Sequence, residues 1–285
     1  SQVNPMARSL PTGRGGTIAL VVSDITNPVV FGMVRGAERA AAEAGYTLIF
    51  AESQESGDRE AATVERIAPA ADGVVLANTR LEGDVIRVLA ARTPIVMING
   101  AADGVPSVAP DVVPGIGQLV DHLAGLGHRS VAFVSGPASS WASARRWEAL
   151  MAAAVAAGLH IVEIGPTAPT VDGGAAAFAR VAASGVTAAV CFNDLVAIGL
   201  VKAAYENGVS VPIDLSVAGC DDIFVSELLV PSLTTVRVDL DEAGARAVRM
   251  LLAEVGVVEG SPEGDRLPTE LVVRDSTGKV PVSLD

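Results

Sequence analysis

Residues 17–50, TIALVVSDITNPVVFGMVRGAERAAAEAGYTLIF, carry the pattern that decides the fold class. Residues 17–23 are mostly apolar and β-branched and hold no charge, which is typical of a strand covered on both faces. A helix is predicted over residues 27–45, because an Asn-Pro pair favours a helix start and a glycine favours its end. Residues 46–50 predict a second strand, so the stretch is one strand–helix–strand unit of a parallel sheet.

The polar segment SDITN, residues 23–27, joins the first strand of this unit to its helix. In parallel sheets built from such units, ligands bind beyond the carboxyl ends of the strands, beside the helix N-termini. Asp24 is the charged residue of this segment. We therefore expect Asp24 to lie at the ligand-binding edge of the sheet.

The composition fits a large protein whose core is built from small and branched side chains. The chain has 285 residues, or roughly two domains of about 150 residues each, and half of the residues are apolar. Its net charge of −13 repels phosphate groups, so the main body is not expected to bind nucleic acid or an anionic membrane. No apolar run is long enough to predict a membrane span, and no signal peptide is visible, which favours a cytoplasmic location.

The cysteines and histidines do not predict a metal site. Cys191 and Cys220 lie in predicted buried strands, and we interpret them as unreactive core thiols rather than a disulfide or a metal-binding pair. No histidine is spaced with cysteine, aspartate or glutamate as in a zinc site. We expect neither a metal ion nor a cofactor.

The alternation of strand and helix continues along the chain and restarts after Asp111, which predicts two consecutive doubly wound α/β halves. Residues 1–16 differ from the rest and predict a tail or linker with a short helix at 5–10. Later helices are predicted at 61–70, 84–91, 116–126, 139–157, 175–183, 194–207 and 241–254. Strands are predicted at 74–77, 95–98, 131–135, 161–164, 188–192, 216–220, 233–236 and 270–274, with a short extended piece at 105–110 and a loop, GPTAPTVDGG, at 165–174.

Polar residues follow four of the predicted strands, at Asp24, 135–137, 193–194 and 221–222. If both sheets bind ligands at their carboxyl ends, these segments face one another across a cleft between the two halves. Asp221 ends an apolar strand, where a charge needs a partner. The sequence therefore predicts a polar binding site at these strand ends.

Structural roles compete with ligand contact at several of these positions. Asn193 is equally compatible with a helix cap and with a ligand contact, since one side chain can serve both. Asp194 fits a first-turn residue that is favourable to the helix dipole better than a ligand contact. Arg145 and Arg146 fit a solvated helix face, and Trp141 is compatible with a core position or with a stacking wall.

The sequence favours ligand binding over catalysis. No G-x-S-x-G, P-loop or G-x-G-x-x-G motif occurs. Asp24 and Asp221 are compatible with a glycosidase acid/base pair. Aspartates combined with asparagine and arginine also describe a site that holds a polyhydroxylated ligand. We therefore do not expect an enzyme.

Four motifs taken together resemble the lactose-repressor (LacI/GalR) family of bacterial transcription regulators. They are TIALVVSDITNP at 17–28, LGHRSVAFVSGP at 126–137, FNDLVAIGL at 192–200, and SVAGCDD with PSLTTV between 216 and 236. The end ELVVRDSTG at 270–278 and the start NPMARSLPTGRGGTIAL at 4–20 match as well. The similarity covers the whole chain in order.

The resemblance implies a periplasmic-binding-protein-like (type I) effector core, with two doubly wound parallel-sheet subdomains and a cleft between them. The helix-turn-helix headpiece of the family is absent from this sequence. Residues 1–16 would be a hinge-helix remnant and linker. The N-terminal subdomain would combine 17–111 with 239–256, and the C-terminal subdomain would combine 112–238 with 257–285.

The resemblance also implies roles for individual residues. In the C-terminal subdomain, the ligand-binding residues would be Ser140, Trp141, Arg146, Asn193 and Asp221. In the N-terminal subdomain, the effector wall would be Ser23, Asp24, Val29 and Val30. Many family members carry aromatics at the last two positions, so two valines argue against a purine. Arg8 and Leu10 would be the DNA-contacting residues of the hinge.

We therefore expect the ligand-sensing domain of a cytoplasmic LacI-type regulator. A small effector, with a sugar or polyol favoured, would bind in the cleft and modulate operator binding by a homodimer. Operator DNA would be bound through the missing headpiece, and no membrane partner is expected. The alternative is a periplasmic sugar-binding protein of an ABC transporter. That protein has no use for the hinge segment NPMARSL at 4–10.

Overall fold

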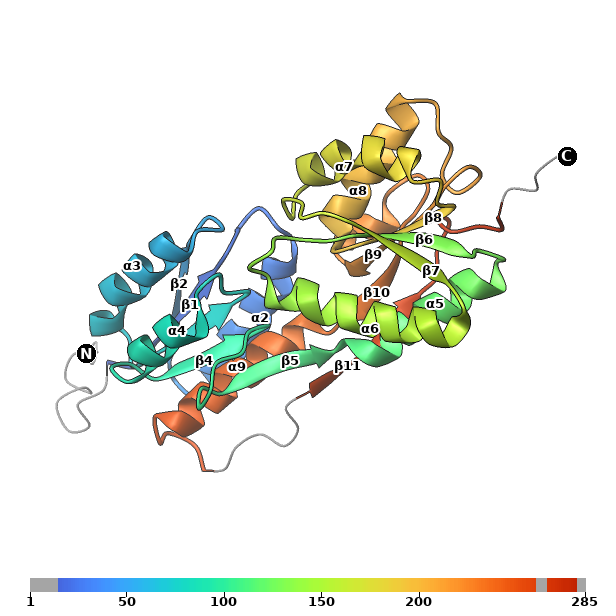
Figure 1. Cartoon of the computed structure of the whole chain (residues 1–285). Coiled ribbons are helices and arrows are strands. Elements are labelled where there is room, and N and C mark those ends of the chain that lie inside the picture. Colours follow the sequence, from blue (N-terminus) through green and yellow to red (C-terminus); the bar gives the residue numbers. More distant parts are fainter. Residues whose placement is uncertain (1–14, 260–265, 281–285) are drawn as a thin grey trace, which may run out of the picture. The chain divides into compact units, whose positions relative to one another are not determined.

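The computed structural model describes residues 15–259 and 266–280 (Figure 1). The chain forms two compact units: unit 1 is Ser1–Pro110 with Asp239–Leu267, and unit 2 is Asp111–Val238 with Pro268–Asp285. None of the described helices is long and apolar enough to cross a membrane. The expected helix at 5–10, with Arg8 and Leu10, lies outside the described residues.

Unit 1 is built on a parallel sheet with the strand order β2-β1-β3-β4-β5. Its strands are β1 (Thr17–Val22), β2 (Thr47–Glu52), β3 (Gly73–Ala77), β4 (Ile95–Ile98) and β5 (Ser107–Asp111). Its helices are α2 (Val29–Glu43), α3 (Gly57–Ile67), α4 (Gly83–Ala90) and α9 (Leu240–Glu254), with a short 3₁₀ turn η1 (Ala68–Ala70). The strand–helix–strand unit predicted for residues 17–50 is present as β1–α2–β2.

Helices cover both faces of the unit 1 sheet. Side chains that alternate along the strands, such as Ala19, Leu76 and Met97, form a core with Val64 of α3 and Ile86 of α4. On the other face α9, which comes from the far end of the chain, packs against α2, β3 and β4 (Figure 1). The sheet therefore needs a segment that the order of the sequence alone would assign to the second half.

Unit 2 is built on a sheet with the strand order β11-β10-β9-β8-β6-β7, in which β11 alone runs antiparallel to its neighbour. Its strands are β6 (Ser130–Val134), β7 (His160–Ile164), β8 (Ala188–Cys191), β9 (Ser216–Asp221), β10 (Thr234–Val238) and β11 (Arg266–Val272). Its helices are α5 (Val112–Gly125), α6 (Trp141–Ala157), α7 (Val171–Ala183) and α8 (Asp194–Glu206), with a 3₁₀ turn η2 (Phe224–Glu227).

The two faces of this sheet carry separate cores. Phe133 and Val190 face α5 and α6 together with Leu150, whereas Val134 and Val217 face α7 and α8. Both faces are covered, so the central strands are continuously apolar, as the sequence pattern indicates. The two units confirm the predicted periplasmic-binding-protein-like α/β fold.

The predicted loop at 165–174 is wrong in its second half. Thr170 caps α7 by accepting a hydrogen bond from the Gly173 backbone N–H at 3.1 Å, and the helix begins at Val171 rather than at 175. The glycines in VDGG suggested a loop. In the structure they lie in the helix. Position 174 needs glycine because a Cβ there would overlap the backbone carbonyl oxygen of Val196 in α8. The glycines permit a close helix–helix contact.

Candidate functional site

The carboxyl edge of the unit 2 sheet brings three segments together. They are the end of β8 with the start of α8, the end of β9, and the first two turns of α6. Arg146 of α6 connects the other two segments, because its guanidinium donates to the backbone carbonyl of Phe192 and to the carboxylate of Asp221. Sequence elements far apart in the chain thus meet in one polar cluster.

The Arg146–Asp221 ion pair is buried. Its Nη2 to Oδ1 distance is 2.6 Å, and the two residues are 5% and 8% exposed. Burial raises the pKa of Asp221, and the charge of Arg146 offsets part of this rise. Burial acts to lower the pKa of Arg146, but its surroundings, led by the carboxylate of Asp221 and including that of Asp194, together raise it. The solvated helix face considered for Arg146 is wrong.

Phe192 contacts Arg146 through its aromatic ring as well as through its backbone carbonyl. The guanidinium carbon of Arg146 lies 5.1 Å from the centre of the Phe192 ring, which is the geometry of a cation–π contact. Gly136 packs against the same ring, and a Cβ at that position would lie 2.7 Å from a ring carbon. The ring and the arginine therefore form one wall of the cluster.

The backbone at the end of β9 adopts a conformation that L-residues rarely take. The φ angles of Asp221 and Asp222 are +112° and +55°. Asp222 is held in place by two ion pairs, to Arg237 and to Arg274, each at 2.7 Å. Such strain persists only where surrounding contacts enforce it, and it concentrates at functional sites.

Asp194 is a buried acceptor rather than a simple first-turn helix residue. It is 1% exposed and accepts hydrogen bonds from the Ile223 backbone N–H at 3.0 Å and from the hydroxyls of Ser226 and Thr235 at 2.6 Å each. Burial, together with the nearby carboxylate of Asp221, raises the pKa of Asp194 to about 7. The sequence did not predict this set of contacts.

Asn193 caps helix α8. Its Oδ1 accepts a hydrogen bond from the Val196 backbone N–H at 2.9 Å, and its Nδ2 donates to the Pro169 carbonyl at 3.2 Å. The cap role that the sequence allowed is confirmed. A ligand could still bind the second N–H of the amide or the second lone pair of Oδ1.

The start of α6 places the other predicted residues of unit 2. Ser140 is buried and caps the helix by accepting from the Ser143 backbone N–H at 3.2 Å. Trp141 is half-buried, with the Arg145 guanidinium carbon 6.0 Å from its ring centre. Arg145 also pairs with Glu148 on the partly exposed face of the helix, in agreement with the solvated role considered for it.

In unit 1 the predicted residues lie at the end of β1 and the start of α2. Asp24 caps its own turn, accepting from the backbone N–H and hydroxyl of Thr26 at 2.8 and 2.6 Å. Ser23 is buried, and so are Val29 and Val30. The next residue, Phe31, is 55% exposed.

The sequence analysis missed Phe192. It is an aromatic residue directly before the Asn-Asp pair, and this position could have suggested that it lines the site. Among the described residues, no group of three or more histidine, cysteine, aspartate or glutamate side chains is arranged to hold a metal ion. Cys191 and Cys220 are both buried in the core, as predicted.

Comparison with known proteins assigns the family. Residues 120–277 match the family model described as a periplasmic binding protein-like domain. The chain is 33% identical over 281 residues to the HTH-type transcriptional regulator in the aml 5′ region of Streptomyces limosus, a match that covers 93% of this chain and 79% of the relative. The chain belongs to the LacI/GalR family.

Two solved structures of regulators resemble this LacI-family chain. A LacI family regulator from Enterococcus faecium with bound ribose superposes with a TM-score of 0.80 at 28% identity, covering 93% of this chain and 99% of that one. The CelR–cellobiose complex superposes with a TM-score of 0.81 at 27% identity, covering 97% and 92%. The relatives are transcriptional regulators rather than enzymes, which agrees with the binding role predicted from the sequence.

Proposed function

We propose that this LacI-family chain senses a hydroxyl-rich effector, a sugar or polyol, and thereby modulates binding to operator DNA in the cytoplasm. The observation that carries the proposal is the buried Arg146–Asp221 pair beside Phe192. A buried ion pair contributes little to stability by itself, because desolvation offsets the attraction. Its presence at the carboxyl edge of the sheet fits a ligand-binding role.

The pair has hydrogen-bonding capacity left for a ligand. Arg146 uses one N–H for Phe192 and one for Asp221, out of the five that a guanidinium carries. Oδ1 of Asp221 accepts from Arg146, and none of the described residues donates to Oδ2. A donor and an acceptor side by side match a sugar hydroxyl, which needs both.

The sugars bound by the two similar regulators, ribose and cellobiose, support this ligand class. The family assignment favours the regulator over the periplasmic transporter component. We propose that Ser140, Trp141 and Asn193 join Arg146 and Asp221 in effector binding. We also propose that unit 1 contributes Ser23, Asp24, Val29 and Val30, and that Arg8 and Leu10 act at the operator.

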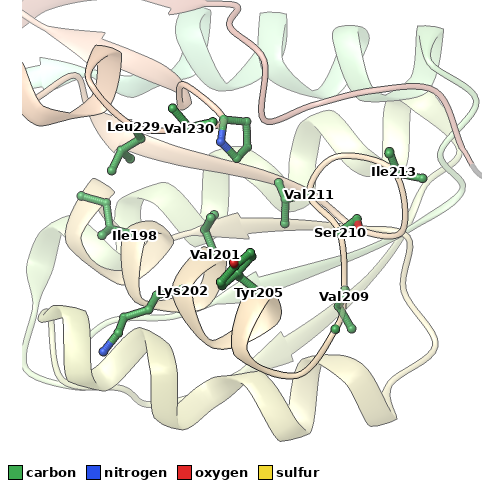
Figure 2. Close-up of a pocket in the computed structure, with 12 residues that line it drawn as sticks. Ile198, Val201, Lys202, Tyr205, Val209, Ser210, Val211, Ile213, Leu229 and Val230 are labelled. Carbon is green, nitrogen blue, oxygen red and sulfur yellow. The ribbon is translucent and has the colours of Figure 1, made fainter.

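We further propose that the regulator is a homodimer. Unit 2 carries a hollow of about 630 Å³ between α8 and the segments 208–213 and 229–231, and Figure 2 shows its largely apolar lining. Tyr205 and Val230 on this face are 84% and 97% exposed. Lys202 is the one charged side chain in the lining. Contiguous exposed apolar surface of this kind marks a protein contact, and a second copy of the chain is the occupant we propose.

Changing Tyr205 or Val230 to aspartate is expected to convert the dimer to a monomer, because a charge would be buried in an apolar contact. Sedimentation velocity at several protein concentrations measures the change. Val155→Asp is the matched control, since Val155 is 74% exposed on α6, away from this face. A dimer that survives both substitutions, or one that Val155→Asp also breaks, would place the interface elsewhere.

A thermal-shift screen tests the ligand class. Ribose, cellobiose, other sugars and polyols are compared with adenosine and inosine, and a sugar or polyol is expected to give the largest shift. A ligand at 100 times its Kd stabilises the folded state by about 2.7 kcal/mol, so a specific effector is readily detected. Val29 and Val30 offer no aromatic face for a base to stack on. A nucleoside that outbinds every sugar would contradict this assignment.

The same screen leads to a test of regulation. A helix-turn-helix headpiece from a LacI-family relative is fused before Asn4, and binding to a palindromic operator is measured at fixed salt. The sugar that stabilises the chain should change the operator affinity of the fusion. If the fusion is a folded dimer and the sugar does not change its operator affinity, the result would count against the regulator function and would support sugar binding alone.

A further inference from the structure

We propose that Asp194 is a positioning residue that holds the effector-binding end of β9, and that it does so as a carboxylate. This inference rests on the proposed effector site, because Asp194 itself is almost fully buried and would act on that site only through the residues it binds. The role differs from the first-turn helix role that the sequence suggested.

Asp194 binds three segments that follow or flank the end of β9. Its Oδ2 accepts from the Ile223 backbone N–H and from the Ser226 hydroxyl of η2, and its Oδ1 accepts from the Thr235 hydroxyl of β10. The strained residues Asp221 and Asp222 directly precede Ile223, and Thr235 lies on β10, in register with Gly219 of β9. One carboxylate therefore holds both the segment that follows Asp222 and the strand beside the end of β9.

Two further contacts show how closely the turn depends on this carboxylate. The Asp222 backbone N–H donates to the Thr235 hydroxyl at 3.3 Å, and the same hydroxyl donates to Asp194 at 2.6 Å. The Cα of Gly219 faces Oδ1 of Asp194, and a Cβ there would overlap this oxygen. Asp194 thus orients Thr235, and Thr235 in turn accepts from the backbone next to Asp221.

The charge state of Asp194 matters because its three partners all donate. A protonated acid or an amide brings a donor of its own to a pocket that supplies donors, so at least one hydrogen bond must be lost or reversed. The backbone N–H of Ile223 cannot reverse its role. Replacing this carboxylate acceptor by an amide should therefore loosen residues 221–227 without removing any contact that an effector makes.

The pKa of Asp194 lies near neutral pH, and charged and titratable groups from three elements surround its carboxyl. Arg146 comes from α6, Asp221 and Cys220 from β9, and Cys191 from β8. Burial raises the pKa of both thiols, to about 12 for Cys220, so they stay neutral. Arg146 thus faces two carboxylates, and burial raises the pKa of Asp194 to about 7. The ionised form, which we propose binds effector more tightly, is lost as pH falls below about 7.

The first experiment measures hydrogen exchange of residues 219–228 without ligand at pH 8, where Asp194 is ionised. Wild-type protein should show protection of these residues, and Asp194→Asn should show weaker protection at the same pH. Asp172→Asn is the matched control, because Asp172 is the first-turn acid of α7 and should change nothing. Equal protection in wild type and Asp194→Asn would overturn the proposal.

The second experiment measures calorimetric binding of ribose and cellobiose between pH 6 and 8.5, in two buffers of different ionisation enthalpy. Wild-type affinity should fall below pH 7, by no more than about tenfold per pH unit for one linked proton, with proton release on binding. Asp194→Asn should bind weakly with a flat profile, and Ser226→Ala should weaken binding if the first variant does not fold. A pH profile unchanged in Asp194→Asn would overturn the proposal.

Absence of binding by any sugar to wild type would reject the proposed function instead, and hydrogen exchange would still decide the role of Asp194.

Discussion

Arg146→Ala is expected to abolish effector binding and to lower the free energy of unfolding by about 3–5 kcal/mol. The substitution leaves Asp221 buried without its cation, and it also leaves the Phe192 carbonyl without a donor. Both groups then lose a hydrogen-bond donor. Asp221→Ala should have a similar effect, because it leaves the guanidinium unpaired. Urea unfolding and the thermal-shift assay with the best sugar measure the two consequences.

A paired variant separates binding from stability. In Arg146→Met with Asp221→Asn, no buried charge is left unpaired, so stability should recover most of the loss. Asparagine suits position 221 because it tolerates a positive φ better than most residues do. Effector binding should remain absent in this double variant. Recovery of sugar affinity together with stability would show that the pair is structural and does not contact the effector.

Arg145→Ala is the matched control for these variants. Arg145 is the neighbouring residue on the same helix, and its ion pair with Glu148 is largely solvated. Exposed pairs of this kind contribute about 0–1 kcal/mol. The control should therefore bind sugar normally and unfold at nearly the wild-type urea concentration. A loss of binding in Arg145→Ala would mean that the site extends onto the outer face of α6.

The strand ends were predictable because they depend on local patterns. Continuous apolar runs such as 188–191 identify buried parallel strands, and the polar residue that follows each run must lie at the sheet edge. Asn193 could be placed for the same reason, since its cap geometry depends on residues within one helical turn. These features need no knowledge of distant contacts.

The partners of the buried charges were not predictable from local patterns. Arg146 and Arg145 are adjacent on the same helix, and whether either one is buried depends on a strand 75 residues away in sequence. Asp194 resembles an ordinary first-turn acid until β10 and η2 pack over it. The placement of α9 against the first sheet likewise depends on a crossover that periodicity does not record.

The role of helical glycines is also not predictable from local patterns. A glycine in a helical pattern suggests that the helix is interrupted, as in the predicted loop at 165–174. Only a known close contact with a neighbouring backbone would argue otherwise. In unit 1 a Cβ on Gly36 of α2 would overlap the carbonyl oxygen of Asp241 in α9. In unit 2 a Cβ on Gly199 of α8 would overlap the carbonyl oxygen of Val171 in α7. Each unit therefore contains a helix pair whose close contact requires glycine.

Gly36→Ala and Gly199→Ala are accordingly expected to be strongly destabilising. Each variant should unfold at a lower urea concentration than the wild-type protein. Overpacking a close contact costs typically about 1–3 kcal/mol and sometimes more, and here the obstacle is backbone rather than a flexible side chain. The helices must separate to admit the methyl group. Because the two glycines lie in different units, Gly36→Ala should lower the stability of unit 1 and Gly199→Ala that of unit 2.

Gly117→Ala is the matched control, since Gly117 lies in α5 and a Cβ there would meet no atom within 4 Å. Alanine at an open helical position should stabilise by about 0.5–1 kcal/mol, because glycine loses more conformational entropy on folding. Hydrogen exchange across each unit assigns the destabilisation, and urea unfolding gives its size. If Gly36→Ala and Gly199→Ala are as stable as Gly117→Ala, the helix pairs can separate without cost. The close α2–α9 and α7–α8 contacts would then not hold the two sheets' outer layers in place.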